Sequence, residues 1–165
     1  MTSIKLLVIG DSCVDEYVYG NCTRLCPDAP VPVFVPKYRK ESGGMSKNVY
    51  NNVMLHDKIE GTLYTNNRII RKTRYVDLVS NQIIIRVDSV DDRVDRITNL
   101  DSIDFSEYDG ILVSDYDKGY ITDDDLDYIC ARHSCVVVDT KKIIDPKVPW
   151  LSSCRYLKLN HHEYE

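Results

Sequence analysis

Four short apolar runs, each ending in a carboxylate or an amide, constrain the fold of this chain more than any other feature. They are KLLVIGD, GILVSD, CVVVD and RYLKLN, which end at Asp11, Asp115, Asp139 and Asn160. The first three contain few polar residues, a pattern typical of strands buried on both faces of a mostly parallel sheet. The fourth fits less well because Lys158 interrupts it. The runs therefore predict an α/β fold.

The segment between the second and third runs, ITDDDLDYICARHS, predicts a helix. Thr122 can cap its N-terminus, and Leu126, Ile129 and Cys130 form an apolar stripe at i, i+3 and i+4. Together with its flanking strands this helix makes a βαβ unit from Gly110 to Asp139, whose crossover we expect to be right-handed.

The polar residues at the strand ends are the first candidate for a functional site. In open α/β sheets, ligands bind in a crevice outside the carboxyl ends of the strands, so Asp11, Asp115, Asp139 and Asn160 are expected to gather at one edge. The alternative is that Asp and Asn only favour the turn that follows a strand. The sequence leaves both interpretations open.

A glycine pair precedes a second predicted helix. After Gly43 and Gly44, the residues Met45, Val49 and Val53 recur at i, i+4 and i+8, which indicates an apolar helix stripe. Glycines at a helix start let a ligand approach the backbone, and the unpaired N–H groups there favour an anion. A Gly-Gly turn without a ligand is the other interpretation.

Two further segments predict strands outside the main sheet. The three prolines at positions 30, 32 and 36 in PVPVFVP cannot donate ladder hydrogen bonds, so this stretch must be an edge strand or belong elsewhere. Residues 68–88 are rich in β-branched side chains around a Ser-Asn break, which favours an antiparallel hairpin. With EYVYG upstream, the proline segment is expected to form a small flap that carries Arg24 and the basic Lys37–Lys40 cluster.

The amino-acid composition limits the kinds of ligand and surface that the chain is expected to bind. The formal net charge of −5 argues against nucleic acid, because binding phosphate backbones needs a surplus of Lys and Arg. The local basic clusters suit a small anionic ligand instead. No apolar run approaches the roughly 18 residues of a membrane span, and the N-terminus lacks a secretory signal. We expect a single cytoplasmic domain over residues 1–165 with no membrane partner.

The six cysteines do not show the paired C-x-x-C spacing of zinc sites. We expect them to be reduced and to serve mainly as small hydrophobic residues. A metal site is the alternative, with Cys22 and Cys26 as its nearest pair.

Several motifs, taken in order, resemble the ribokinase-like (phosphofructokinase-B type) carbohydrate kinases, and among them the heptose 7-phosphate kinase domain of bifunctional ADP-heptose synthases. The motifs are VIGDSCVDEYVYGNCTRLCPDAPVPVF, SGGMSKNV, KTRYVDLVSNQIIIRVD, VSDYDKGYIT, VVVDTK and LNHHEYE. The resemblance implies a truncated ribokinase-like fold, with a mostly parallel sheet flanked by helices and a small β lid formed by strands at about residues 16–40. It covers nearly the whole chain but only about the first half of the family's fold.

The resemblance also implies site residues. Asp11 and Asp15 would hydrogen-bond sugar hydroxyls, and Arg24 with the lid would close over the sugar. ATP and Mg²⁺ would be the cofactors. The implied sugar-binding set is Asp11, Asp15, Arg24, Gly43, Gly44, Asn48, Lys72, Arg74 and Asp115. The implied cofactor-binding set is Lys118, Asn160 and Glu163, with Glu163 also organising the metal ion.

The sequence departs from the family in two respects. The Gly-Ala-Gly-Asp motif that carries the family's catalytic base is absent, and only HDKIEGTLYTNN stands where relatives have room for another strand-helix unit. We therefore expect a kinase that transfers the ATP γ-phosphate to a hydroxyl of a heptose phosphate or similar sugar but is incomplete as a catalyst alone. The alternative is a catalytically inactive module that binds a sugar phosphate. The expected partners are a second copy bound through the lid or a complementing polypeptide.

Overall fold

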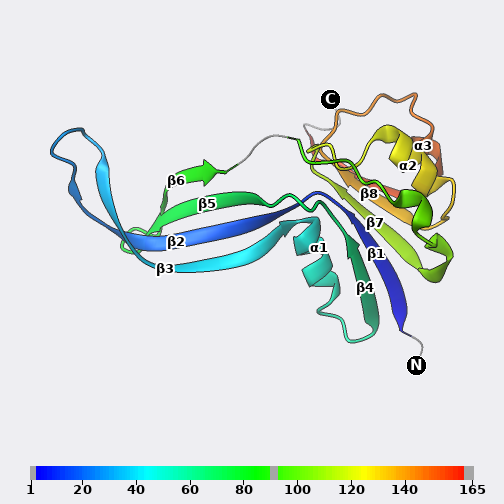
Figure 1. Ribbon diagram of the computed structural model, residues 1–165, viewed down its shortest axis with the longest axis horizontal. Coiled ribbons are helices and arrows are strands. Elements are labelled where there is room, and N and C mark those ends of the chain that lie inside the picture. Colours follow the sequence, from blue (N-terminus) through cyan, green and yellow to red (C-terminus); the bar gives the residue numbers. More distant parts are fainter. Residues whose placement is uncertain (1–2, 90–92, 162–165) are drawn as a thin grey trace. The chain divides into compact units, whose positions relative to one another are not determined.

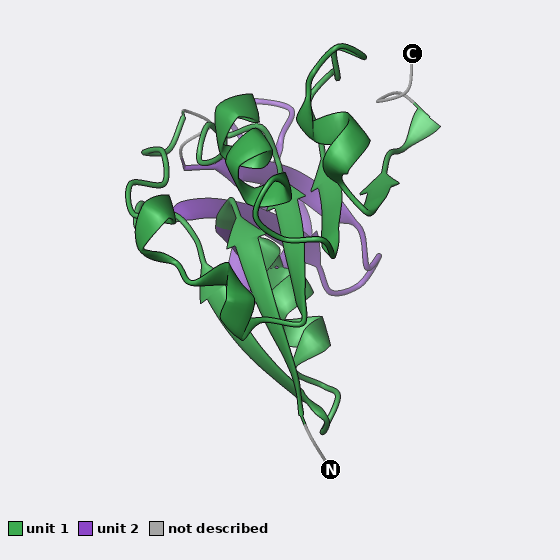
Figure 2. Ribbon diagram, turned by 90° about the vertical axis from the view of Figure 1, so that its right-hand side faces the viewer, with its two compact units in different colours: residues 1–12, 43–69, 92–165 green, residues 13–42, 70–91 purple. Residues whose placement is uncertain are grey.

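The computed structural model describes residues 3–89 and 93–161. These residues form two compact units (Figure 2), and each unit is discontinuous in the sequence. Unit 1 comprises the described residues within 1–12, 43–69 and 92–165, and unit 2 those within 13–42 and 70–91.

Unit 1 is built on a five-stranded sheet in which every paired neighbour is parallel. The strand order is β4-β1-β7-β8-β9. The strands are β1 (Ile4–Gly10), β4 (Ile59–Tyr64), β7 (Gly110–Asp115), β8 (Val136–Thr140) and β9 (Tyr156–Lys158). This sheet confirms the four predicted strands and the parallel βαβ unit, and it adds β4 as an edge strand that the sequence analysis did not predict.

The helices of unit 1 confirm both helix predictions (Figure 1). Helix α2 (Asp123–Cys130) begins with a capping box, in which Thr122 and Asp125 each bond the other's backbone N–H. Helix α1 (Ser46–Val53) follows the glycine pair. The shorter helices are α3 (Trp150–Ser153), η1 (Leu100–Ser102) and η2 (Phe105–Glu107).

The core of unit 1 consists of the β-branched and aliphatic side chains of the central strands, packed with the apolar stripe of α2. Burial of each such side chain contributes about 1.5–3 kcal/mol. The fully buried members include Leu7, Val8, Ile9, Ile111, Val113, Val136, Val138, Leu126, Ile129 and Trp150.

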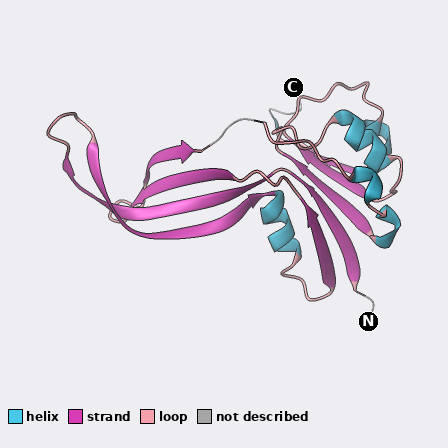
Figure 3. Ribbon diagram, in the orientation of Figure 1, coloured by secondary structure: helices cyan, strands magenta, loops and turns pink. Residues whose placement is uncertain are grey.

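Unit 2 carries a four-stranded sheet in the order β3-β2-β5-β6, and its described residues contain strands but no helix (Figure 3). The strands are β2 (Ser12–Leu25), β3 (Pro32–Met45), β5 (Ile70–Asp77) and β6 (Ile83–Asp88). β2 pairs in parallel with β5, and β5 pairs antiparallel with β6. The structure confirms the proline-rich segment as an edge strand of a separate sheet and residues 68–88 as an antiparallel hairpin.

Among the described residues, no helix is long and apolar enough to cross a membrane. All six cysteines lie in the described ranges, and none forms a disulfide.

Candidate functional site

The carboxyl ends of the parallel strands in unit 1 bring three of the predicted polar residues to one edge. The register places Gly10 beside Ser114, and Ser114 beside Asp139. Asp11 and Asp115 therefore lie at the same end of neighbouring strands, with Asp139 on the next strand. Asn160 follows the end of β9 by two residues and is exposed.

Asp11 is fully buried and binds the loop that follows β7. Its Oδ2 accepts a hydrogen bond from the backbone N–H of Tyr116 at 2.7 Å, and its Oδ1 accepts one from Tyr120 at 3.3 Å. Burial raises the pKa of Asp11, and the nearby Asp115 carboxylate adds to the increase, although the backbone N–H groups oppose it. Asp11 thus fixes the 116–120 loop at the strand ends.

Asp115 is also fully buried and is held from two sides. Its Oδ1 accepts the backbone N–H of Asp117 at 2.9 Å. Its Oδ2 accepts the hydroxyl of Thr140 at 2.9 Å and pairs with Lys142 Nζ at 2.9 Å. Lys142 donates as well to the carbonyl of Ile121 at 2.7 Å. Two carboxylates therefore hold the loop that contains Lys118.

The end of β1 is joined closely to the start of α1. Ser46 donates its backbone N–H to the Asp11 carbonyl at 2.9 Å and its hydroxyl to the Gly10 carbonyl at 3.0 Å. A Cβ on Gly10 would lie 1.9 Å from the Ser114 carbonyl oxygen, so only glycine fits there. The sequence analysis missed Ser46, although a serine directly at the start of the predicted helix was an available signal.

The glycine pair and Asn48 occupy the first turn of this helix and the residues before it. Gly44 is buried, Gly43 is half-buried and Asn48 is exposed. A Cβ on Gly43 would lie 2.2 Å from Lys47 Cγ. In unit 1 the structure therefore joins the end of β1 at Asp11 to the start of α1, directly after the end of β3 that contains Gly43 and Gly44.

In unit 2, three of the predicted residues form one cluster. Asp15 pairs with Arg74 NH1 at 2.6 Å, and Lys72 lies opposite Asp15 in the register of β2 and β5. The Arg74 guanidinium also lies 5.1 Å from the centre of the Tyr17 ring. Arg24 is exposed near the far end of β2, so it does not join this cluster within the unit.

Glu16 forms a second polar cluster that the sequence analysis missed. Its carboxylate accepts the Thr73 hydroxyl at 2.7 Å and pairs with Arg39 at 3.2 Å and Arg71 at 3.6 Å. The hydrogen bond from Thr73 is the main cause that lowers the pKa of Glu16. Because side chains alternate along a strand, Glu16 faces away from Asp15. The adjacent acidic residues Asp15 and Glu16 were the signal available.

The cofactor-binding prediction falls partly outside the described residues, since Glu163 lies beyond them. Lys118 and Asn160 are described, on the 116–120 loop and after β9 respectively. Within the described ranges, no three His, Cys, Asp or Glu side chains group so that they could hold a metal ion. The metal-binding prediction for Glu163 therefore stays a prediction that lies outside the described residues.

Comparison with known proteins finds relatives that are named bifunctional protein HldE, although no family model matches the chain. The bifunctional protein HldE of Helicobacter acinonychis (strain Sheeba) is 35% identical over 142 residues, covering 67% of this chain and 31% of the relative. HldE of Helicobacter pylori (strain J99 / ATCC 700824) is 29% identical over 204 residues, covering 96% of this chain and 44% of the relative. The chain thus spans less than half the length of these curated relatives.

Two solved structures match nearly the whole chain. Ribokinase of Arabidopsis thaliana, complexed with ribose and ATP, has a TM-score of 0.54 at 13% identity and covers 99% of this chain and 62% of that one. Ribokinase of Cryptococcus neoformans var. grubii, in complex with ADP, has a TM-score of 0.53 at 13% identity and covers 98% and 58%. By fold, the chain is ribokinase-like. The expected carbohydrate kinase fold and the relationship to part of HldE are both confirmed.

This ribokinase-like chain is shorter than its relatives within the region they share. The match to the Helicobacter pylori protein extends over 204 positions, whereas the chain has 165 residues. In the structure, β4 ends at Tyr64 and β5 begins at Ile70, so five residues connect them. This short connection agrees with the expectation that a strand-helix unit is absent there.

Proposed function

We propose that this chain is the sugar-binding part of a carbohydrate kinase that transfers the γ-phosphate of ATP to a hydroxyl of a heptose phosphate or similar sugar. The observation that carries the proposal is the edge of the parallel sheet, where Asp11 and Asp115 lie together at the start of α1. The ribokinase-like fold and the sequence relationship to HldE support the same class of reaction.

In this proposal the sugar is held by side chains with complementary hydrogen-bonding capacity. Asp15 and Asn48 bind sugar hydroxyls, since a carboxylate accepts hydrogen bonds and an amide both accepts and donates them. Arg24, Lys72 and Arg74 attract the phosphate that the sugar already carries. Asp11 and Asp115 are positioning residues, because their carboxylates are already bound to the loop that contains Lys118.

The catalytic base is the part that this sequence does not supply. No Gly-Ala-Gly-Asp motif occurs in it, and a positioned general base typically contributes about 10²–10⁴-fold to the rate. We derive no step through the metal ion, because Glu163, the residue expected to organise it, lies outside the described residues. We expect little phosphoryl transfer by the chain alone, and a complementing polypeptide would have to provide the base.

The second candidate function is a module that binds a sugar phosphate without turnover. The observation that favours it is the engagement of Asp115, whose carboxylate is bound to Thr140, Lys142 and a backbone N–H. A carboxylate held in this way is not free to accept a proton from a sugar hydroxyl.

Measuring ADP release and sugar binding in parallel tests both candidates. The 165-residue chain is incubated with MgATP and a panel of sugar phosphates that includes heptose 7-phosphate, and binding is followed by calorimetry. Asp15→Ala should abolish binding, whereas Asp57→Ala, at an exposed carboxylate with no hydrogen bond to the described residues, should not.

Each result has a distinct meaning. Sugar-dependent ADP release that Asp15→Ala removes would establish a kinase, and binding without ADP release would establish the module. If neither sugar phosphate binding nor turnover depended on Asp15, the proposed sugar site would be wrong.

A further inference from the structure

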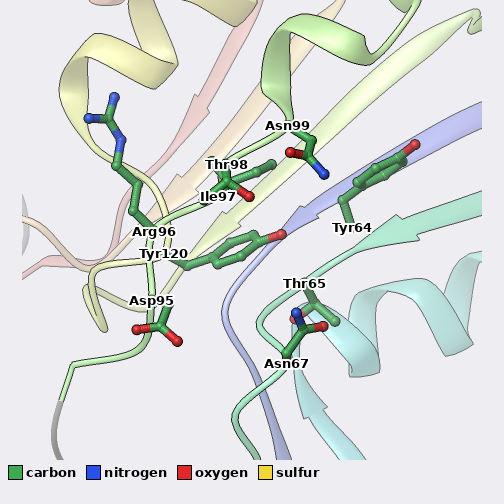
Figure 4. A pocket seen from close by; sticks show the side chains of 9 residues that line it. All are labelled: Tyr64, Thr65, Asn67, Asp95, Arg96, Ile97, Thr98, Asn99 and Tyr120. Carbon is green, nitrogen blue, oxygen red and sulfur yellow. The ribbon is translucent and has the colours of Figure 1, made fainter.

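Unit 1 contains a pocket (Figure 4). Its lining includes none of the residues proposed above as sugar ligands. Its volume of about 460 Å³ lies in the range of roughly 300–1,000 Å³ that small-molecule sites occupy. The lining residues come from the end of β4 and its connection, the segment before η1, and the loop after β7. They are Tyr64, Thr65, Asn67, Asp95, Arg96, Ile97, Thr98, Asn99 and Tyr120.

The wall of this pocket is held by backbone hydrogen bonds. Val94 N–H bonds the Lys118 carbonyl at 2.8 Å, and Ile97 N–H bonds the Tyr120 carbonyl at 2.9 Å. Val94 and Ile97 are themselves buried, which anchors the segment that carries Asp95 and Asn99. The backbone of the segment that carries Asp95 and Asn99 is therefore held in place by the fold.

The polar groups of the pocket are largely uncommitted. Within the described part of the chain, five lining side chains make no hydrogen bond or ion pair: Tyr64, Asn67, Asp95, Asn99 and Tyr120. In Figure 4 the hydroxyl of Tyr120 points toward Tyr64 and Asn99. Phenols, amides and a carboxylate can together both donate and accept hydrogen bonds, which is what a ligand with several hydroxyls requires.

The charge of the pocket disfavours an anion. The Arg96 guanidinium points away from the other lining side chains (Figure 4) and forms a bidentate pair with Asp125 at 2.7 and 2.9 Å. The Asp95 carboxylate forms no ion pair with another described residue. A single carboxylate is also too few ligands for a metal ion. These features favour an uncharged ligand.

The Tyr120 hydroxyl faces the pocket, whereas in Figure 4 the Tyr64 hydroxyl points away from the other lining side chains. Burial raises the pKa of Tyr120 to about 12, so its hydroxyl keeps its proton at neutral pH and can donate.

We propose that this pocket binds an uncharged, hydroxyl-rich ligand of monosaccharide or polyol type. The proposal goes beyond the kinase function, since it concerns residues that the sugar-phosphate site does not use and needs no ATP.

Titration of the ¹⁵N-labelled chain with D-mannose and D-ribose, followed by NMR, tests it. We expect shifts of the backbone amides of residues 64–67, 95–99 and 120. Asp95→Asn should weaken binding by about tenfold, the usual loss when a hydrogen bond to a charged group is removed. Asn99→Leu should weaken it as well. Asp101→Asn, a matched change at an exposed carboxylate outside the lining, should have no effect.

Several results would overturn the proposal that this pocket binds an uncharged sugar or polyol. Inorganic phosphate and adenosine are the anionic and planar probes, and preferential shifts of the pocket amides by either would overturn the proposal. So would the absence of sugar-induced shifts, or shifts that Asp95→Asn and Asn99→Leu leave unchanged in variants with native-like spectra. Asp15→Ala should preserve mannose binding here, so failure of the kinase proposal and failure of this one can be told apart.

Discussion

Asp11 accepts backbone hydrogen bonds from residues more than one hundred positions later in the chain. The sequence predicts a carboxylate at a strand end, and this is correct. It does not reveal that both carboxylate oxygens are bound to the 116–120 loop, because that contact depends on how the loop after β7 folds back. At this scale a strand-end carboxylate that holds a loop and one that binds a ligand look the same in sequence.

The titration of Asp11 gives a test of its burial. Its folded pKa is raised above 3.8, so between pH 3.8 and the folded value the native state binds more protons than the unfolded state. The free energy of unfolding from this group therefore falls as pH rises through that window. Carboxyl-carbon NMR should place the Asp11 midpoint above 3.8 and Asp115→Asn should lower it. A midpoint at or below 3.8 in the native chain would contradict the burial argument.

Replacing Gly10 tests the close approach of two strands. A Cβ at Gly10 would lie 1.9 Å from the Ser114 carbonyl oxygen, whereas the nearest atom to one at Gly110 would be Leu6 Cδ2 at 3.2 Å. Gly10→Ala should lower the free energy of unfolding by roughly 1–3 kcal/mol or more, as overpacking does. Gly110→Ala should cost less. Denaturant unfolding measures both, and equal losses would show that the approach at Gly10 relaxes freely.

The elements themselves were largely predictable. Continuous apolar runs predicted the inner strands, because both faces of a parallel sheet are covered. Thr122 and the apolar stripe that includes Leu126 predicted α2. β4 was missed for the converse reason. It is an edge strand whose residues are exposed or half-buried, and Glu60, Gly61 and Thr62 interrupt its apolar residues.

The candidate site was less predictable than the elements. Pairing of Asp15 with Arg74 depends on the register of two strands separated by 59 positions in sequence. The resemblance to a family implied that both residues bind the sugar, but it did not imply that they contact each other. Only the structure shows that they neutralise each other within unit 2, and that Glu16 does the same with Arg39 and Arg71.

The capping box of α2 provides a test at the scale of an element. Thr122 accepts the Asp125 N–H, and Asp125 accepts the Thr122 N–H at 2.8 Å. Thr122→Ala should reduce the free energy of unfolding by about 0.5–2 kcal/mol. Thr98→Ala, at an exposed threonine without such a cap, is the matched control. Thermal unfolding followed by circular dichroism would disprove the role of the cap if the two variants were equally stable.

At the scale of the whole molecule, the edge strand β6 exposes a row of apolar side chains. Ile83, Ile85 and Val87 are all exposed. Ile85 and Val87 lie on the same face of β6 because Arg86 separates them in the part of the strand that pairs regularly with β5, before the register shift opposite Tyr75 and Val76. Exposed apolar edges promote association. The expected homodimer therefore has a specific candidate surface on β6, which belongs to the same sheet as the lid strands.

Sedimentation analysis at micromolar concentration tests this association. We expect the chain to form a dimer, and Ile85→Lys should weaken the dimer by about tenfold or more if Ile85 lies at its centre. Val79→Lys, at an exposed turn residue, is the control. A monomer in the native chain, or a dimer that Ile85→Lys leaves intact, would contradict the assignment.

The pairing of β1 with β7 has a consequence for synthesis on the ribosome. Leu6 pairs with Gly110, so the inner strand β1 emerges about a hundred residues before β7, one of its two neighbours. At a translation rate of about 5–20 residues per second, β1 waits roughly 5–20 s for that partner. During this interval its apolar residues have an unpaired edge, and a chaperone that binds extended apolar segments would find its target in β1.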